Sequence, residues 1–348
     1  MERLKGKRLN DNRNVVAAVI RDKEFQWGGC LFVLALVAAF LISASALAQS
    51  YPTKAIKMIV PFPPGGISDV LARVIGQKLS ESWGQPVVIE NRPGAGTTIA
   101  ADFVAKSPPD GYTLYFIDIT SHAINASLYR KLSYDSVKDF APVMLVTSTP
   151  LMLVLHPSVP AKSVKELIAL AKSKPGQLNI AHSGIGTITH LTGEMFKSMA
   201  GIDMVNIPYT GSAPATTAVL SGEASMIFST MPPALTHTKA GKLRALAVTT
   251  PTRVAAAPDI STMVEAGVPG FESVLWNGIL APAKTPKEII DKINSEMRRI
   301  LQMPDVKERF AAQGGEIGPS TPEQLAAHIK AEIAKWAKVV KASGAQVD

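Results

Sequence analysis

Cysteine is almost absent from this sequence: Cys30 is the single thiol among 348 residues. One cysteine forms no internal disulfide, and its position in a removable N-terminal segment would leave the mature chain with no thiol at all. Such a chain suits an oxidising compartment and lacks cysteine nucleophiles and thiolate metal sites. The composition is otherwise globular, because 47% of the residues are apolar and the length suffices for two domains.

Clustered positive charge is also missing, although the net charge is +8. Residues 1–48 hold seven Lys and Arg residues against four Asp and Glu residues, so the remainder carries only about +5, spread along the chain. No basic block alternates with aromatic residues in the way that suits a nucleic-acid strand. The sequence therefore predicts no nucleic-acid partner, and its mild positive balance favours an anionic small molecule.

The first 48 residues have the three regions of a secretory signal peptide. Five basic residues from Arg3 to Arg13 precede an apolar run of 12 residues at 31–42, and Ala46-Leu47-Ala48 supplies the small residues before a cleavage site. The run is short for a membrane span, so an uncleaved anchor helix is the alternative. Cys30 precedes the run, whereas a lipoprotein signal places its cysteine after it. We expect cleavage after Ala48 and a periplasmic protein.

From residue 51 onward, apolar strand-like runs alternate with helix-like segments, which predicts an α/β protein with largely parallel or mixed sheets flanked by helices. Two long extended segments, 143–155 and 271–282, interrupt this alternation. They indicate that the chain leaves one lobe, builds a second and returns. We therefore predict a first lobe at 49–148 plus 275–348 and a second at 149–274, with two hinge strands and a closing cleft.

Three helix starts are marked by a hydroxyl residue that can cap free N–H groups. Ser163 and Thr285 each stand three residues before a glutamate, which makes a capping box, and Thr321 precedes Pro322 and Glu323 in a similar way. We expect helices to begin at these points.

Four loops share one pattern, in which an apolar strand is followed by a turn of small residues and a helix start. They lie at 63–69, 93–98, 183–187 and 210–214, two in each expected lobe. Glycine allows a ligand to approach the backbone closely, and the helix that follows offers free N–H donors with a partial positive charge. In "PFPPGGISD" the prolines hold the entry to Gly65 and Gly66 rigid. Such loops, at the carboxyl ends of strands, predict an anion site.

The anion is predicted to be a carboxylate. The phosphate-loop string G-x-x-x-x-G-K-[ST] and the dinucleotide string G-x-G-x-x-G are both absent, and none of the four loops contains lysine or arginine. Asp69 leaves two interpretations open. It caps free N–H groups in the first turn of its helix, or it orients a water molecule or an ammonium group of the ligand.

Catalytic groups are sparse. His190 and Glu194 share a helix face, but no second histidine stands in the H-E-x-x-H register, and Ser183 fails the G-x-S-x-G pattern at its first position. We therefore expect no enzyme activity, no metal and no cofactor. Two alternatives stay open: a periplasmic hydrolase that uses Ser183 or His190, and a ligand sensor that presents its closed form to a membrane kinase.

Six motifs, in order over 51–348, resemble the periplasmic solute receptors of tripartite tricarboxylate transporters, the Bug family. They are "YPTKAIKMIVPFPPGGISDVLAR", "VVIENRPGAGT", "SPPDGYTL", "LAKSKPGQLNIAHSGIGTITHL", "VNIPYTGSAPA" and "AGKLRALAV". The resemblance implies the two-lobed type II periplasmic-binding-protein fold. It also implies a monomeric receptor that captures a small organic carboxylate and delivers it to membrane permease subunits.

The resemblance further implies which residues enclose the ligand carboxylate, through backbone N–H groups and bound waters: Phe62, Gly66, Ile67, Asp69, Gly186 and Thr187. The conformational freedom of glycine adds Gly65 to this set. Ser121, Ser183 and Tyr209 are candidates for specificity. Asn206 replaces a histidine, and Thr210 a lysine, that are common in the family. Both changes make the rim of the cleft less basic, which argues against a multiply charged ligand such as citrate.

Overall fold

Ten strands form one hydrogen-bonded sheet in this computed structural model, which describes residues 51–347. Their order is β2-β1-β3-β9-β4-β7-β5-β6, with β8 and β10 paired to β4. β1 pairs in parallel with β2 and β3, and β5 with β6 and β7. The strands are β1 (Ile56–Val60), β2 (Val87–Asn91), β3 (Thr113–Asp118), β4 (Phe140–Leu155), β5 (Asn179–His182), β6 (Val205–Pro208), β7 (Met226–Thr230), β8 (Arg244–Val248), β9 (Val274–Pro282) and β10 (Glu316–Ile317).

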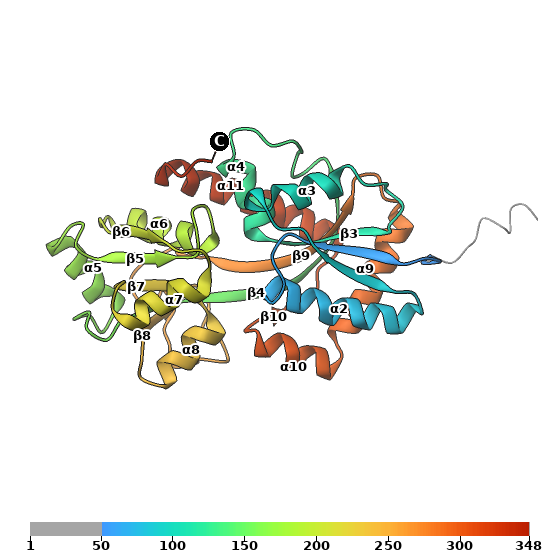
Figure 1. Cartoon of the computed structure of the whole chain (residues 1–348). Helices are drawn as coiled ribbons and strands as arrows, with labels where there is room; N and C mark the ends of the chain where they lie inside the picture. The colour runs from blue at the N-terminus through green and yellow to red at the C-terminus, as the bar shows by residue number, and fades with distance from the viewer. Residues whose placement is uncertain (1–50, 348) are drawn as a thin grey trace, which may run out of the picture. The chain divides into compact units, whose positions relative to one another are not determined.

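Helices cover the strands of both lobes (Figure 1). Two of the short segments are irregular: η1 (Ala95–Thr97) is a 3₁₀ turn and η2 (Thr120–Ile124) is a π-helical turn. The α-helices are α2 (Ile67–Trp83), α3 (Thr98–Ala105), α4 (Asn125–Leu128), α5 (Val164–Ser173), α6 (Ile188–Ala200), α7 (Ser212–Ser221), α8 (Met231–Lys239), α9 (Lys287–Leu301), α10 (Pro304–Ala312) and α11 (Pro322–Ser343).

β4 and β9 join the two lobes. β4 has 16 residues and pairs antiparallel with β9 from Phe140 to Pro150. It then pairs with β7 over its last five residues and with β8 from Met152 to Leu155. Figure 1 shows these two strands running between the β1–β3 group and the β5–β8 group. The predicted two-lobed α/β fold with two hinge strands is thus confirmed, with the added finding that both lobes share β4. The exact lobe boundaries stay a prediction.

The central strands carry apolar residues on both faces, and these residues form much of the core. All six residues of β3 are buried, as expected for a strand with elements packed on either side. α2 buries one stripe at helical spacing that includes Leu71, Ile75 and Leu79. One large cluster of buried side chains extends through both lobes, and a smaller one lies around α7, α8 and β7.

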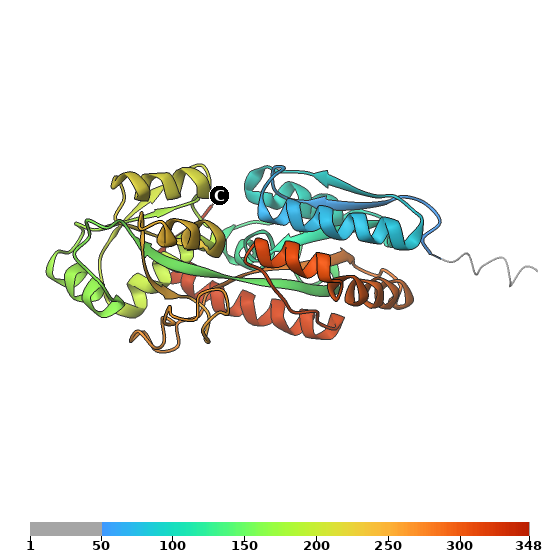
Figure 2. The same cartoon turned by 90° about the horizontal axis from the view of Figure 1, so that it is seen from below.

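The C-terminal helix α11 packs against parts of both lobes. It contacts η2 and α4 of the first lobe, the shared strand β4, and α6 of the second lobe. Figure 2 shows the same helix from below, running alongside β4. The carboxylate of Glu332 accepts hydrogen bonds from the indoles of Trp276 in β9 (3.2 Å) and Trp336 in α11 (3.0 Å). This buried carboxylate therefore fastens a hinge strand to α11.

Two of the three expected caps are confirmed and one is wrong. Ser163 accepts the N–H of Glu166, and Thr321 forms a capping box with Gln324. Thr285 instead donates its hydroxyl to the carbonyl of Pro282, and α9 begins at Lys287 without a side-chain cap. α10 and the turn and short helix at 120–128 are elements that the sequence pattern did not predict.

None of the helices described between residues 51 and 347 is long and apolar enough to cross a membrane. The predicted signal peptide, its cleavage point and Cys30 lie outside the described residues.

Candidate ligand-binding site

The loop between β1 and α2 presents uncapped backbone N–H groups. Gly65 has a φ of +89° and the N-cap residue Gly66 a φ of −75°, and no side chain caps α2. The first N–H groups of a helix have no partner inside the helix. Those of Ile67 and Ser68 therefore suit an anion at this end of α2. Phe62 lies half-buried at the start of the loop.

Asp69 has its carboxylate surrounded by donors from the protein itself. The N–H of Gly65 (2.9 Å), the Nε of Arg73 (3.0 Å) and the side-chain amide of Asn91 (2.9 Å) all donate to it. Asn91 also donates to the carbonyl of Phe62 (3.0 Å), which ties the loop to β2. Burial raises the pKa of Asp69, but these hydrogen bonds outweigh burial and the net pKa is lowered. Asp69 therefore binds the loop N–H of Gly65 and does not cap the first-turn N–H groups of α2. This bond removes the Gly65 N–H from the groups open to a ligand.

Both arginines near this loop are already paired. The guanidinium of Arg73 lies 3.0 Å from Oδ1 of Asp69 and also donates to Asn91. That of Arg92 lies 2.5 Å from Glu90 and stacks 3.7 Å above the ring of Phe103. Neither contributes an unpaired positive charge, which suits recognition by neutral N–H donors.

The loop before α3 is fastened to α4. The side-chain amide of Asn125 donates to the carbonyl of Gly96 (2.7 Å) and to the hydroxyl of Thr97 (2.9 Å), and the phenol of Tyr129 donates to the carbonyl of Ala95 (3.0 Å). Ala95 and Thr97 both have positive φ, a conformation that these contacts hold in place. This second glycine loop is therefore a turn held in place by contacts with α4 and Tyr129.

In the second lobe, three hydroxyls close the loop between β5 and α6. Ser183 lies 2.8 Å from the hydroxyl of Thr189 and 3.2 Å from that of Thr187. Thr187 caps α6 and donates to the carbonyl of Gly184 (2.7 Å). The hydroxyl of Ser183 thus interacts with other hydroxyls rather than with a base, which is not the arrangement of a nucleophile.

Gly186 is the point where this loop approaches the first lobe. A Cβ built on Gly186 would lie 2.2 Å from Cδ2 of Leu128 in α4, so any larger residue would require that side chain to move, and the φ of +77° favours glycine. Its N–H donates to Nδ1 of His190 (3.1 Å). The preceding residue, Ile185, exposes 61% of its surface.

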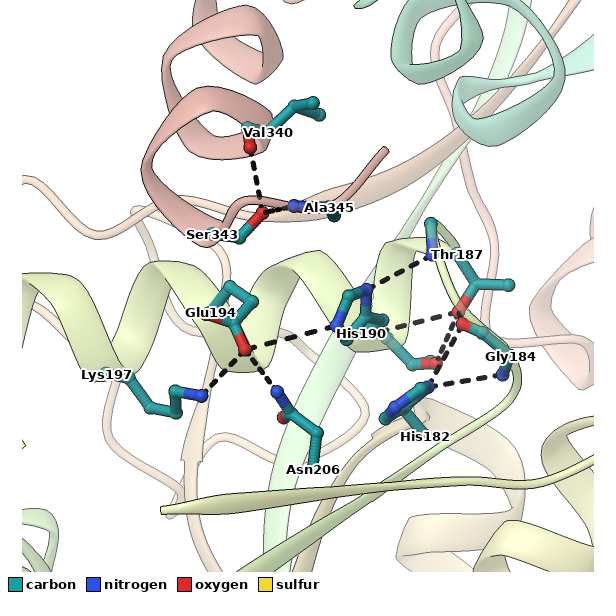
Figure 3. Close-up of polar contacts among 12 residues, drawn as sticks. His182, Gly184, Thr187, His190, Glu194, Lys197, Asn206, Val340, Ser343 and Ala345 are labelled. Carbon is teal, nitrogen blue, oxygen red and sulfur yellow. Dashed lines mark hydrogen bonds and ion pairs between the residues drawn. The ribbon is translucent and has the colours of Figure 1, made fainter. Parts of the chain in front are cut away.

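Below the loop, His190 lies in a polar row along α6, with Glu194 on one side and the loop on the other (Figure 3). Its Nε2 is 3.9 Å from Glu194, whose carboxylate also binds Lys197 (2.7 Å) and the amide of Asn206. The ring of His182 lies 4.4 Å from that of His190. Burial lowers the pKa of His190 to about 4, and it lowers the pKa of His182 as well. Both rings are neutral at physiological pH.

The ten predicted site residues fall into three groups. Phe62, Gly65, Gly66, Ile67 and Asp69 share the loop before α2, and Ser183, Gly186 and Thr187 share the loop before α6. Tyr209 joins the second group through its backbone, since its N–H donates to the carbonyl of His182 (2.9 Å), but its hydroxyl donates to Glu223 (2.9 Å).

Ser121 stands apart and is fully buried in η2. It exchanges hydrogen bonds with Asp118, including one from its N–H to the carboxylate (2.8 Å). Burial raises the pKa of Asp118 to about 6, although the bonds from Ser121 lower it.

The residues that hold these loops were not predicted from the sequence. Asn91, Asn125 and Leu128 each join a glycine loop to another element, and no sequence motif in the loops points to them. The one available signal was the polar stretch "TSHAIN" directly after β3, because residues at the carboxyl end of a parallel strand commonly line a site. Among residues 51–347, no cluster of three or more His, Cys, Asp or Glu residues could hold a metal ion.

Two α/β lobes, two hinge strands and glycine-rich helix starts in each lobe define a solute-binding protein. Solved structures of that class match the chain closely. The R. palustris protein Rpa4515, solved with adipate, is 38% identical with a TM-score of 0.76, over 85% of this chain and 99% of that one. MatC from Rhodopseudomonas palustris, solved with malate, is 33% identical with a TM-score of 0.73, over 83% of this chain and 100% of that one.

Residues 71–345 match the model of the tripartite tricarboxylate transporter family receptor, and the chain belongs to this family. Protein BugT of Bordetella pertussis is 40% identical over 320 residues, covering 90% of this chain and 98% of that protein. The family is one of transporter receptors, not of enzymes. The hydrolase alternative built on Ser183 or His190 is thereby excluded.

Proposed function

We propose that this protein binds a small organic carboxylate in the cleft between its lobes and delivers it to the membrane permease of a tripartite tricarboxylate transporter. The observation that carries the proposal is the uncapped start of α2, where the first-turn N–H groups follow Gly66 and both nearby arginines are paired. Neutral donors at a helix start suit a carboxylate of low charge. Adipate and malate in the two similar structures support the same class of ligand.

We further propose that the ligand carboxylate contacts Gly66, Ile67, Gly186 and Thr187. Phe62 lines the binding site, and Ser183 and Tyr209 contact the rest of the ligand and determine specificity. The Gly65 N–H and the Asp69 carboxylate act by holding the loop, because each already binds the other. A periplasmic location, reached through a signal peptide cleaved after Ala48, and a monomeric state complete the proposal.

A thermal-shift screen with short mono- and dicarboxylic acids, adipate and malate included, tests this function. A ligand that binds only the folded state at about one hundred times its Kd stabilises the protein by about 2.7 kcal/mol. We expect at least one acid to raise the melting temperature and to be recovered unchanged. Matched phosphate and sulfate controls should have no such effect. Stabilisation by phosphate but by no carboxylate would contradict the proposal.

A further inference from the structure

Two helix starts outside the site show how the side chain of the third helical residue can accept a backbone N–H at the start of its helix. In α5, Glu166 accepts the N–H of Lys162 (2.7 Å), while Ser163 accepts the N–H of Glu166. In α11, Gln324 accepts the N–H of Thr321 (2.8 Å) and returns its own N–H to the Thr321 hydroxyl. The contacts in α11 are those of a capping box, whereas in α5 the glutamate binds the N–H of the residue before the N-cap.

α6 uses the arrangement of α5 with a histidine as the third helical residue. Thr187 accepts the N–H of His190, and Nδ1 of His190 accepts the N–H of Gly186 (3.1 Å). An imidazole nitrogen accepts a hydrogen bond only while it carries no proton. The bond to Gly186 therefore exists only with Nδ1 unprotonated, unlike the bonds to Glu166 and Gln324.

The groups around His190 determine how readily it takes a proton. His182 of β5 faces it at 4.4 Å between ring centroids, and Glu194 of α6 faces its Nε2 at 3.9 Å. Lys197 binds the same Glu194 oxygen at 2.7 Å, which offsets the attraction of that carboxylate for an imidazolium. Asn206 of β6 completes this shell with a neutral amide that also donates to Glu194.

α11 adds charge on the outer side of the same row. Lys335 and Lys338 line a cavity of about 500 Å³ together with Glu194 and Glu272. The two lysines and two glutamates give this side of the row a net charge close to zero. Burial then dominates and lowers the pKa of His190 to about 4, so the ring is neutral in the ligand-free protein.

We propose that capture of a carboxylate by the loop before α6 is coupled to uptake of one proton by His190. This inference rests on the proposed function, in which Gly186 donates to the ligand. A carboxylate oxygen that accepts the Gly186 N–H replaces Nδ1 as its acceptor, and the freed nitrogen then lies beside an anion. Nδ1 takes a proton from solvent and the N–H so formed donates to the carboxylate, which leaves an imidazolium–carboxylate pair.

The sign of the pH dependence follows from this step. A bound anion raises the pKa of His190 above its ligand-free value, so affinity increases as pH falls from about 7.5 to about 5.5, by at most about tenfold per pH unit. At lower pH the ligand carboxylates become protonated and oppose the gain.

Isothermal titration with adipate and malate at about pH 6, in two buffers of different ionisation enthalpy, measures the protons taken up per ligand bound. We expect uptake of a fraction of a proton up to one. The variant His190→Gln introduces glutamine, the residue type that Gln324 provides at the same position of α11, and it has no titratable nitrogen. It should therefore bind the acid without proton uptake and with an affinity independent of pH. Glu166→Gln, the matched change at the start of α5, should retain the wild-type uptake.

Two results overturn the inference alone: binding by the wild type without proton uptake, or uptake that persists in His190→Gln. A histidine NMR titration of the wild type provides a second check that needs no variant, because the pKa of His190 must rise when the acid binds. If none of the tested carboxylic acids binds, the proposed function fails first and this inference fails with it.

Discussion

Asp69 holds the loop before α2 through donors that come from three directions. Gly65, Arg73 and Asn91 each bind its carboxylate, whose side chain is only 4% exposed. Asp69→Asn removes the charge and turns one acceptor into a donor that faces Arg73 or Asn91. We expect the free energy of unfolding in urea to fall by about 1–3 kcal/mol, because hydrogen bonds to a buried charge are lost. The exposed pair of Lys54 and Asp110 is the control, and Asp110→Asn should change stability by less than about 0.5 kcal/mol.

The difference in unfolding free energy between wild type and Asp69→Asn depends on pH, and its sign follows from the pKa of Asp69. The pKa of Asp69 is lowered on folding, so its stabilisation is fully present above its unfolded value of 3.8 and is lost as pH falls through the folded value. Wild type and Asp69→Asn should therefore differ by a constant amount from about pH 7 to about pH 5 and converge below about pH 4. An equally stable variant that loses only amino-acid ligands would show instead that Asp69 binds a ligand ammonium group.

Sequence alone could locate these residues but not their partners. The glycines, the caps at Ser163 and Thr321 and the choice of a carboxylate all follow from local rules that depend on a few neighbouring residues. The bond from Asn91 to Asp69 spans 22 positions, and the contact of Gly186 with Leu128 joins two lobes. Such contacts depend on how β1 pairs with β2 and how the lobes pack, which local patterns do not encode.

Among the larger elements, α11 and β9 are joined by one buried carboxylate. Glu332 accepts bonds from Trp276 and Trp336 and pairs with Lys335 at 2.8 Å. Glu332→Gln retains one acceptor oxygen but loses the ion pair and places an amide N–H near the indole donors. We expect a loss of about 1–3 kcal/mol in unfolding free energy, with a changed tryptophan fluorescence spectrum in the folded protein.

Lys330→Gln, at an exposed position of the same helix, should change neither the stability nor the emission. A Glu332→Gln variant with wild-type stability and emission would show that the two indoles do not depend on this carboxylate.

Strands and long helices were predictable because hydrophobic period and caps act locally, whereas the missed elements lack those signals. The turn and short helix at 120–128 contain Thr, Ser, His and Asn and are held by tertiary contacts such as those of Asn125. Thr285 has the sequence of a cap, yet the chain there leaves β9 in a turn that takes its hydroxyl to Pro282. Tertiary geometry overrides the local rule in both places.

For the molecule as a whole, we predict that the contact between Leu128 and Gly186 limits how far the lobes close. A methyl group at position 186 would overlap Leu128 and would also strain a φ of +77°. We expect Gly186→Ala to bind its ligand less tightly and to close less completely. Leu128→Ala in the same chain should restore closure by making room, although the backbone strain of about 1 kcal/mol remains.

Closure can be measured by energy transfer between dyes attached to two introduced thiols, Gln77→Cys in α2 and Lys172→Cys in α5. Both positions are exposed, and residues 49–348 contain no native thiol that would compete for the dyes. Saturating carboxylate should raise the transfer efficiency of the otherwise unaltered protein and raise it less in Gly186→Ala.

Gly241→Ala is the matched control: φ there is +67° and a new Cβ meets nothing within 4 Å, so strain is added without a contact between lobes. If both alanine variants reduce the change equally, the effect comes from backbone strain, and the Leu128 contact does not limit closure.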